Sequence, residues 1–188
     1  MKIGRTFYAK NRRQWRSWLA KHHKTHDEIW LIYYKKESGK PRVPYSDAVE
    51  EALCFSWIDS IAKPLDRNRW AQRFSPRRPK SNLSPMNRER VRRLLKAGQM
   101  TRAGLEALRS HGVGRTAGSR RLVIPADILE HLKRDPVVWR NFKRFPASYK
   151  RIRIGWIDGS RNRIAAFEAR LRYFLKMTKA NKRFGMVQ

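Results

Sequence analysis

The chain has 188 residues, of which 45 are Lys or Arg and 15 are Asp or Glu, so its formal net charge is +30. Both halves are basic, because the excess of cations is +11 up to Lys80 and +19 after it. Aromatic residues make up 11% of the chain, which excludes a wholly disordered protein. So large a charge attracts polyanions through counterion release, and we expect a nucleic acid, an anionic membrane face or an acidic protein as the partner.

Simple features of the chain exclude several other classes of protein. Cys54 is the only cysteine, so no intrachain disulfide can form and no oxidising compartment is required. The first residues lack the apolar run of a signal peptide, and no stretch of about 18 apolar residues occurs. The sequence also lacks glycine-rich phosphate loops and nucleophile elbows. We therefore predict a cytoplasmic protein without a cofactor.

The first quarter of the chain predicts two helices around one buried strand. Asn11 and Gln14 have the spacing of a capping box, and the helix that they begin is expected to end near His22. Residues 29–35, Ile-Trp-Leu-Ile-Tyr-Tyr-Lys, predict a buried strand because they are aromatic and β-branched and too few for a typical helix. Ser46 is predicted to cap a second helix.

Two further strands and two further helices are expected before residue 111. The strands are predicted at Cys54–Ile61 and Arg69–Phe74. Asn87–Ala97 predicts a helix that Gly98 ends, and Thr101 is predicted to cap the next one. The outer face of the Asn87–Ala97 helix is expected to carry Arg88, Arg90, Arg92, Arg93 and Lys96.

Beyond a Gly-, Ser- and Arg-rich segment, the elements that the chain predicts are helices. Pro125 and Asp135-Pro136 indicate helix starts, and Gly159 indicates a helix end. Residues 164–175 carry an apolar stripe at helical spacing. The sequence thus predicts an α+β fold, with a small, mostly antiparallel sheet flanked by helices in residues 1–111, a linker at 112–121 and a helical region in residues 122–188.

The basic loop at residues 73–81 is a candidate anion cradle. Guanidinium groups bind phosphate in a forked geometry, and Pro76 and Pro79 reduce the entropy that the loop loses on binding. The alternative is a solvated linker that joins the sheet to the next helix. With the arginines of that helix, the loop forms a candidate anion- and nucleic-acid-binding surface of Arg73, Arg77, Arg78, Lys80, Ser81, Arg88, Arg92 and Arg93.

A second candidate site is a pocket for an anionic substrate. Trp57 and Asp59 share one face of a predicted strand, and Arg73, Phe74 and Arg77 follow in the next strand and loop. Asp59 is either a pocket carboxylate or the partner in a structural ion pair. One carboxylate without a second acid, a base or a metal favours the ion pair. We therefore assign no catalytic residue and lean towards a protein that is not an enzyme.

Two smaller patterns complete the set of candidate sites. His22 and His26 have the spacing of two metal ligands on a helix, but without a third ligand they are better explained as cations at a helix end. Most of the aromatic residues are needed for the core. Tyr34, and Trp70 beside Arg69, are the candidates for exposed platforms on which bases stack.

Several segments resemble the YdeI or OmpD-associated family, also called OmdA or bacteriocin-protection proteins. The most specific are Phe55-Ser56-Trp57-Ile58-Asp59 and the loop at residues 73–81, and the resemblance extends more loosely to the helices beyond Asp135. Three positions depart from the family's pattern. Ser56 stands where the family usually has Gly, Leu83 where it has Trp, and Ser160 where it has Thr.

The resemblance implies a role in protection against bacteriocins or cationic peptides but brings no catalytic mechanism. A protein of charge +30 repels cationic peptides, so such a role would be indirect. Our leading hypothesis is therefore a non-enzymatic protein that binds a polyanion, RNA or DNA. The alternatives are an enzyme or small-ligand binder with the Asp59 pocket, and indirect protection against bacteriocin stress.

Overall fold

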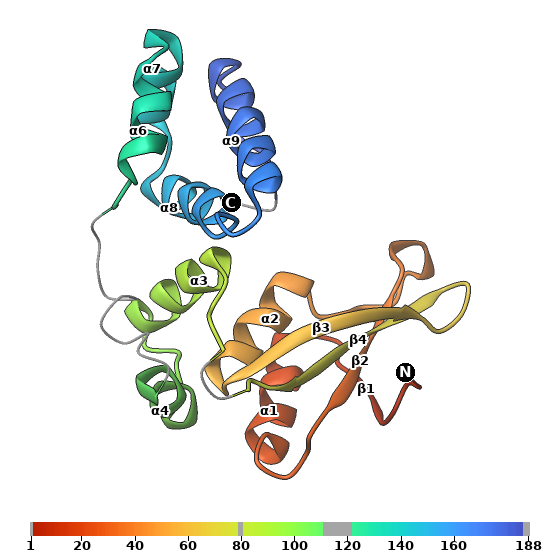
Figure 1. Ribbon diagram of the computed structural model, residues 1–188. Helices are drawn as coiled ribbons and strands as arrows, with labels where there is room; N and C mark the ends of the chain where they lie inside the picture. The colour runs from red at the N-terminus through yellow and green to blue at the C-terminus, as the bar shows by residue number, and fades with distance from the viewer. Residues whose placement is uncertain (1, 79–80, 111–121, 186–188) are drawn as a thin grey trace. The chain divides into compact units, whose positions relative to one another are not determined.

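The computed structural model describes residues 2–78, 81–110 and 122–185 (Figure 1). The described residues form two compact units. The N-terminal unit comprises residues up to 82 and residues 90–110, and the C-terminal unit comprises residues 83–89 and those from 122 onward. The N-terminal unit contains a four-stranded sheet with helices, and the described part of the C-terminal unit is helical, which confirms the α+β prediction. The predicted linker at 112–121 lies outside the described residues, so the predicted domain boundary stays a prediction.

The sheet has the strand order β1-β2-β4-β3. Its strands are β1 (Thr6–Tyr8), β2 (Ile29–Tyr34), β3 (Trp57–Pro64) and β4 (Arg69–Pro76). β1 runs parallel to β2, whereas β2 pairs with β4 and β4 with β3 in the antiparallel sense, so the sheet is mostly antiparallel as predicted. The turn between β3 and β4 is closed by Asp66, whose carboxylate accepts a hydrogen bond from the Asn68 N–H at 2.8 Å.

Helix α1 (Arg12–His22) begins at a capping arrangement close to the predicted one. The Gln14 N–H donates to Asn11 Oδ1 at 3.0 Å. The Gln14 side-chain oxygen accepts from the N–H of Lys10 at 2.8 Å, one residue earlier than a standard capping box requires. The side chains that α1 buries, Trp15 and Leu19, lie on one stripe of the helix and pack towards the sheet.

Helix α2 (Tyr45–Cys54) differs from its prediction at both ends. Pro44 is its N-cap residue and Ser46 lies inside the first turn, so the predicted capping by Ser46 is wrong. The helix continues through Cys54, so β3 begins at Trp57 and the predicted strand start at Cys54 is also wrong. The chain turns at Ser56, which has a φ of 61°. That left-handed conformation favours glycine, and Ser56 is the position where the resembling family usually has Gly.

The two remaining helices of this half follow their predicted signals. α3 (Pro85–Lys96) is followed by Gly98 in the left-handed conformation, with a φ of 63°. Thr101 caps α4 (Arg102–Ser110) by accepting a hydrogen bond from the Gly104 N–H at 3.2 Å. A Cβ atom on Gly104 would lie 2.2 Å from the Cys54 carbonyl oxygen, so only glycine allows this close approach of α4 to α2.

The core of the N-terminal unit lies between the sheet and the helices α1 and α2. Trp15 of α1 contacts Phe74 of β4 at a ring-centroid distance of 5.2 Å, and its indole N–H donates to the Ala48 carbonyl of α2. Leu31 and Trp57 are also fully or almost fully buried. Both helices therefore cover the sheet face that carries Leu31, Trp57 and Phe74.

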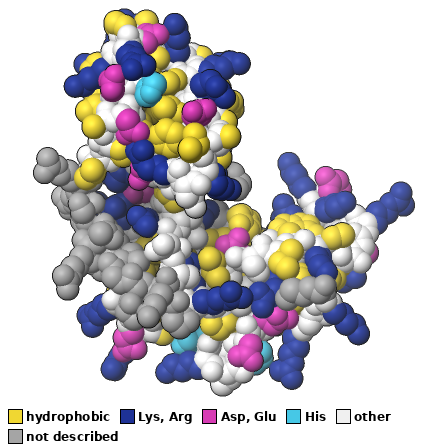
Figure 2. Space-filling view, viewed as in Figure 1, with side chains coloured by type: hydrophobic (Ala, Val, Ile, Leu, Met, Phe, Trp, Pro, Cys, Tyr) yellow, Lys and Arg dark blue, Asp and Glu magenta, His cyan; other side chains and the backbone are white. Residues whose placement is uncertain are grey.

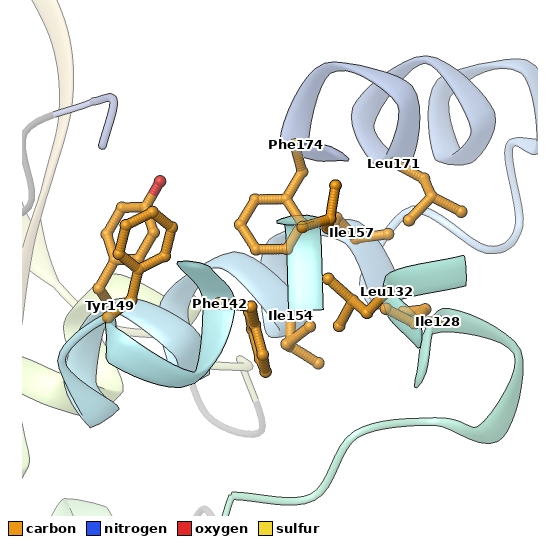
Figure 3. Close-up of a cluster of buried hydrophobic side chains, with 10 residues drawn as sticks. Ile128, Leu132, Phe142, Tyr149, Ile154, Ile157, Leu171 and Phe174 are labelled. Carbon is orange, nitrogen blue, oxygen red and sulfur yellow. The ribbon is translucent and has the colours of Figure 1, made fainter. Parts of the chain in front are cut away.

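The C-terminal unit packs four described helices around an aromatic and aliphatic core (Figure 3). They are α6 (Ala126–Lys133), α7 (Pro136–Arg144), α8 (Ala147–Asp158) and α9 (Ile164–Lys179). Asp135 caps α7 by accepting from the Val137 N–H at 2.8 Å, as predicted. Leu171 and Phe174 of the predicted stripe are buried, but Ile164 is 73% exposed. None of the helices in the described ranges is long and apolar enough to cross a membrane.

Candidate nucleic-acid interface

The sheet has one face that α1 and α2 do not cover. Paired residues of neighbouring strands share a face, so the register places Tyr8 with Ile32, and Tyr34 with Arg69, opposite the buried Leu31 and Phe74. We call this surface the open face. By the strand register it carries Tyr8, Trp30, Ile32, Tyr34, Ile58, Lys63, Arg69, Ala71 and Arg73, of which Trp30 and Ala71 are fully buried.

Tyr34 is the centre of an aromatic and cationic cluster on the open face. The Tyr8 ring meets it edge-on, with ring centroids 5.0 Å apart. The Lys40 ammonium lies 4.7 Å from the centroid of the Tyr34 ring, and the Arg69 guanidinium lies 5.9 Å from it. Arg42 donates a hydrogen bond to the Tyr34 carbonyl. Arg69 is also paired with Asp66 at 2.6 Å, so Lys40 and Arg42 are the cations beside this partly exposed ring that suit contact with the phosphates of a stacked base.

An ion pair covers another part of the open face. Arg73 Nε donates to Glu28 Oε2 at 2.6 Å, and the Trp30 indole N–H donates to the other carboxylate oxygen at 3.1 Å. The bond from Arg73 lowers the pKa of Glu28 below its ordinary value of 4.5. Arg73 therefore lies over the buried Trp30 and is neutralised by Glu28, whereas the sequence suggested that it belongs to the anion cradle.

The basic loop folds back on itself through Arg77. Arg77 Nη2 donates to the Ser81 carbonyl at 3.2 Å, to Ser81 Oγ at 3.1 Å and to the Asn82 carbonyl at 3.0 Å. Burial lowers the pKa of Arg77 below its ordinary value. Arg78 is exposed, and Lys80 lies outside the described residues. Arg77 thus closes the loop.

The arginines predicted on α3 have different surroundings. Arg88 is exposed, and its Nε donates to the Leu83 carbonyl at 3.2 Å. Arg93 forms an ion pair with Glu50 at 2.6 Å, and Arg92 is partly buried. Arg90 is only partly exposed, which differs from the predicted outer face, and burial lowers its pKa. The α3 residues therefore do not form one uniform basic surface.

The residues proposed for an anionic-substrate pocket differ in burial and in the face of the sheet on which they lie. Trp57 and Phe74 are almost fully buried in the core, where neither can line an open pocket. Arg73 precedes Phe74 on the same strand and so points to the opposite face of the sheet. Asp59 accepts a hydrogen bond from the Tyr45 hydroxyl at 2.5 Å. Burial, and to a smaller extent this bond, raises the pKa of Tyr45 to about 12.

The histidines and the cysteine have structural surroundings. His22 and His26 pack on each other with ring centroids 4.9 Å apart, and both contact Trp18. Within the described residues, no cluster of three or more His, Cys, Asp or Glu side chains is placed to hold a metal ion. Cys54 is buried, and burial raises the pKa of its thiol to about 11, so it is a poor nucleophile.

Sequence reasoning identified Tyr34 and Arg69 but missed the rest of their cluster. Tyr8 lies in a strand of three residues, which is too short for a periodic signal. Lys40 and Arg42 lie in the segment after the turn at Gly39, and they reach Tyr34 only because the chain folds back there. Trp70, the other candidate platform, stacks on Tyr33 at 4.3 Å on the face that the helices cover.

Basic side chains are spread over the visible surfaces of both units, with fewer acidic ones among them (Figure 2). Residues 7–107 match a family model described as a domain of unknown function, DUF8412. Residues 121–181 match a second model, described as "Bacteriocin-protection, YdeI or OmpD-Associated", which confirms the resemblance for the C-terminal part of the chain. Residues 55–59 and 73–81, where the sequence resembled that family most specifically, lie within the first match instead. No curated protein and no solved structure matches the chain.

Proposed function

The chain belongs to the DUF8412 family, which it matches over more than half its length, and on that premise we propose that it is a non-enzymatic nucleic-acid-binding protein. The open face of the sheet is the proposed binding surface for single-stranded RNA or DNA. The single observation that supports this function best is the cluster of Tyr8 and Tyr34 with Lys40, Arg42 and Arg69 on a sheet face that α1 and α2 leave uncovered.

The chemistry of the cluster suits a single strand better than a duplex. An unpaired base can stack on an aromatic ring whatever its identity, and each stacked base contributes about 1–3 kcal/mol. Cations beside the ring neutralise the phosphates that flank the base. In a duplex the flat faces of the bases are already stacked, so only the phosphates would be accessible to this surface.

The charge of the chain supports a polyanion as the partner. Its 15 acidic residues cannot neutralise 45 basic ones in any arrangement. Several of the acids are already held in ion pairs, as Glu28 is with Arg73 and Glu50 with Arg93. The cations in excess are available to replace counterions on a phosphate backbone. Further cations in excess would extend the contact along the strand without reading its sequence.

The C-terminal match suggests a second role, protection against bacteriocins, that the physical evidence favours less. A strongly basic protein repels the cationic peptides that such protection would have to bind. Indirect protection against bacteriocins, in which the protein acts by binding a nucleic acid, is compatible with the proposed function. An enzymatic role is not favoured, because the residues proposed for a substrate pocket are divided between the core and the two faces of the sheet.

Binding of a labelled single-stranded oligonucleotide, followed by fluorescence anisotropy at several salt concentrations, tests the proposal. We expect Lys40→Ala/Arg42→Ala to weaken binding about tenfold or more near 0.1 M salt, and to reduce the salt slope by about 1.4, since each phosphate contact contributes about 0.7. Tyr34→Leu should weaken binding by about 1–3 kcal/mol while leaving the slope unchanged.

The matched control is Lys24→Ala/Lys96→Ala, which removes the same charge from two exposed sites off the open face. If the control weakens binding as much as Lys40→Ala/Arg42→Ala, the protein binds through its overall charge and the open face is not the site. Binding that is weak and insensitive to salt in the unmodified protein would contradict the function itself.

A further inference from the structure

A hollow of ≈ 680 Å³ lies between strand β1 and helix α1, beside the open face. It is lined by Phe7 and Tyr8 from β1 and, among others, by Arg13, Ser17, Trp18 and Lys21 from α1. This volume is in the range of small-molecule sites, about 300–1,000 Å³. Tyr8 belongs both to this hollow and to the open face.

Basic side chains on two neighbouring stripes of α1 differ in whether a carboxylate lies beside them. Arg12 and Arg16, four residues apart, both donate to the buried carboxylate of Glu51, at 2.5 and 2.6 Å. Arg13 and Lys21 lie on the adjacent stripe and line the hollow, whose described lining includes neither Asp nor Glu. The hollow therefore has a positive potential that no acidic group in its wall compensates, and this favours an anion.

An aromatic cluster forms the inner wall of the hollow. Trp18 is partly exposed and is stacked against Trp15 with centroids 5.4 Å apart and an interplanar angle of 11°. Phe7 stacks on Trp18 at 5.7 Å, and His22 contacts Trp18 at 5.0 Å. These contacts hold the indole in place, so its accessible part offers a rigid surface to a flat ring without a large entropy cost.

The cationic end of the hollow lies at the start of α1. Lys10 and Arg13 line it there, where the helix dipole adds a partial positive charge. Gln14 also lines this end, and its amide NH₂ group is a donor that its two capping bonds do not use. Trp18 follows Arg13 by five positions, a rise of about 7.5 Å along the helix axis, so the cationic end and the aromatic wall are separated along the hollow.

We propose that this hollow is a nucleotide site, in which Lys10 and Arg13 bind the phosphate and Trp18 contacts the base. The inference goes beyond strand binding on the open face and does not depend on it, because a free mononucleotide would fill the hollow by itself. The same chemistry is present in the terminal nucleotide of a strand, which would reach the hollow across Tyr8 from the open face. The two sources are separated by experiment.

A chemical-shift titration of the full chain with adenosine 5′-monophosphate tests the site. Inorganic phosphate and adenosine serve as the two half-ligands, and each should bind at least about tenfold more weakly than the nucleotide. Lys10→Ala/Arg13→Ala should weaken nucleotide binding about tenfold or more, whereas Lys24→Ala/Lys96→Ala should change it less than about twofold. Ser17→Trp places a large ring in the hollow without removing a charge, and it should abolish binding.

Three outcomes would overturn the proposal. They are nucleotide binding no tighter than that of phosphate, equal losses in the two charge variants, and unchanged binding by a folded Ser17→Trp protein. Two oligonucleotides of the same sequence, one with a 5′-phosphate and one with a 5′-hydroxyl group, identify the natural ligand. Tighter binding of the phosphorylated oligonucleotide identifies a strand end as the ligand, and equal binding of the two identifies the free nucleotide. If the protein binds the nucleotide but no oligonucleotide, this inference holds and the open-face proposal is refuted. If it binds oligonucleotides but not the nucleotide, the open-face proposal holds and this inference is refuted.

Discussion

The two compact units provide partners for their arginine side chains in different ways. In the N-terminal unit, Glu51 is 2% exposed and accepts hydrogen bonds from both Arg12 and Arg16. In the C-terminal unit, Arg153 is 7% exposed and lies 4.1 Å from the centroid of the Phe184 ring, with Tyr149 and Trp156 also in contact.

The difference shows how a chain with a shortage of carboxylates can bury cations. Arg153 donates to the Phe184 carbonyl, and its buried Nε has no hydrogen-bond partner among the described residues. Burial lowers its pKa below the ordinary value. Rings and a carbonyl can therefore hold a guanidinium without an acid, and this leaves acidic residues for pairs such as the one at Glu51. The Glu51 carboxylate should then be needed for stability, whereas the charge of Arg153 should be replaceable.

The largest expected effect is that of Glu51→Gln, which tests the first half of this comparison. Removing one partner of a buried ion pair costs about 3–5 kcal/mol, and we expect about 2–3 here because Arg12 and Arg16 can turn to water. Urea unfolding followed by tryptophan fluorescence measures the loss. Glu37→Gln, at an exposed position, is the control and should change stability by less than about 0.5 kcal/mol. Equal effects of the two variants would show that the buried carboxylate is not needed.

A smaller effect is expected for Arg153→Met, which tests the second half. Methionine keeps the apolar length of the side chain against the rings and removes a buried charge with an unpartnered nitrogen. The loss of the bond to the Phe184 carbonyl should then cost no more than about 1 kcal/mol. Arg153→Ala, which also removes the packing, should cost about 2–4 kcal/mol. Thermal unfolding of both variants measures these changes, and a loss with Met as large as that of Glu51→Gln would remove the contrast between the units.

Local sequence signals predicted most of the elements, and they failed where a residue adopts an unusual backbone conformation. The caps at Asn11, Thr101 and Asp135 and the glycine end at Gly98 depend on a few neighbouring residues, so the pattern sufficed. The start of β3 could not be predicted, because it depends on a left-handed φ at Ser56, a residue that rarely adopts one.

The candidate site was harder to predict than the fold. In Ile29–Tyr34 every residue is apolar or aromatic, so alternation could not show which face the helices cover. The sequence also did not show which groups the arginine side chains contact. Nothing near Arg73 in the sequence indicates that it pairs with Glu28, 45 residues away, or that Arg77 closes its own loop. In a chain with this many arginines, the sequence predicts that a basic surface exists but not which cations compose it.

The smallest expected effect compares two exposed ion pairs of opposite orientation. On α6, Glu130 precedes Arg134 by four residues, and on α4 Arg102 precedes Glu106 by four. The first order agrees with the helix dipole and the second opposes it, because Arg102 lies at the positive N-terminal end. Glu130→Gln should therefore lower the urea midpoint more than Glu106→Gln does, although both shifts should be smaller than that of Arg153→Met.

The pH dependence checks that charge is the cause. The bond from Arg134 lowers the pKa of Glu130 below its ordinary value of 4.5, so the contribution of this ion pair to stability is complete above that pH and is lost as the pH falls through the lowered pKa. The difference between the two variants should disappear in strong acid and shrink in high salt. A difference that persists under both conditions would mean that packing, not charge, separates the two helices.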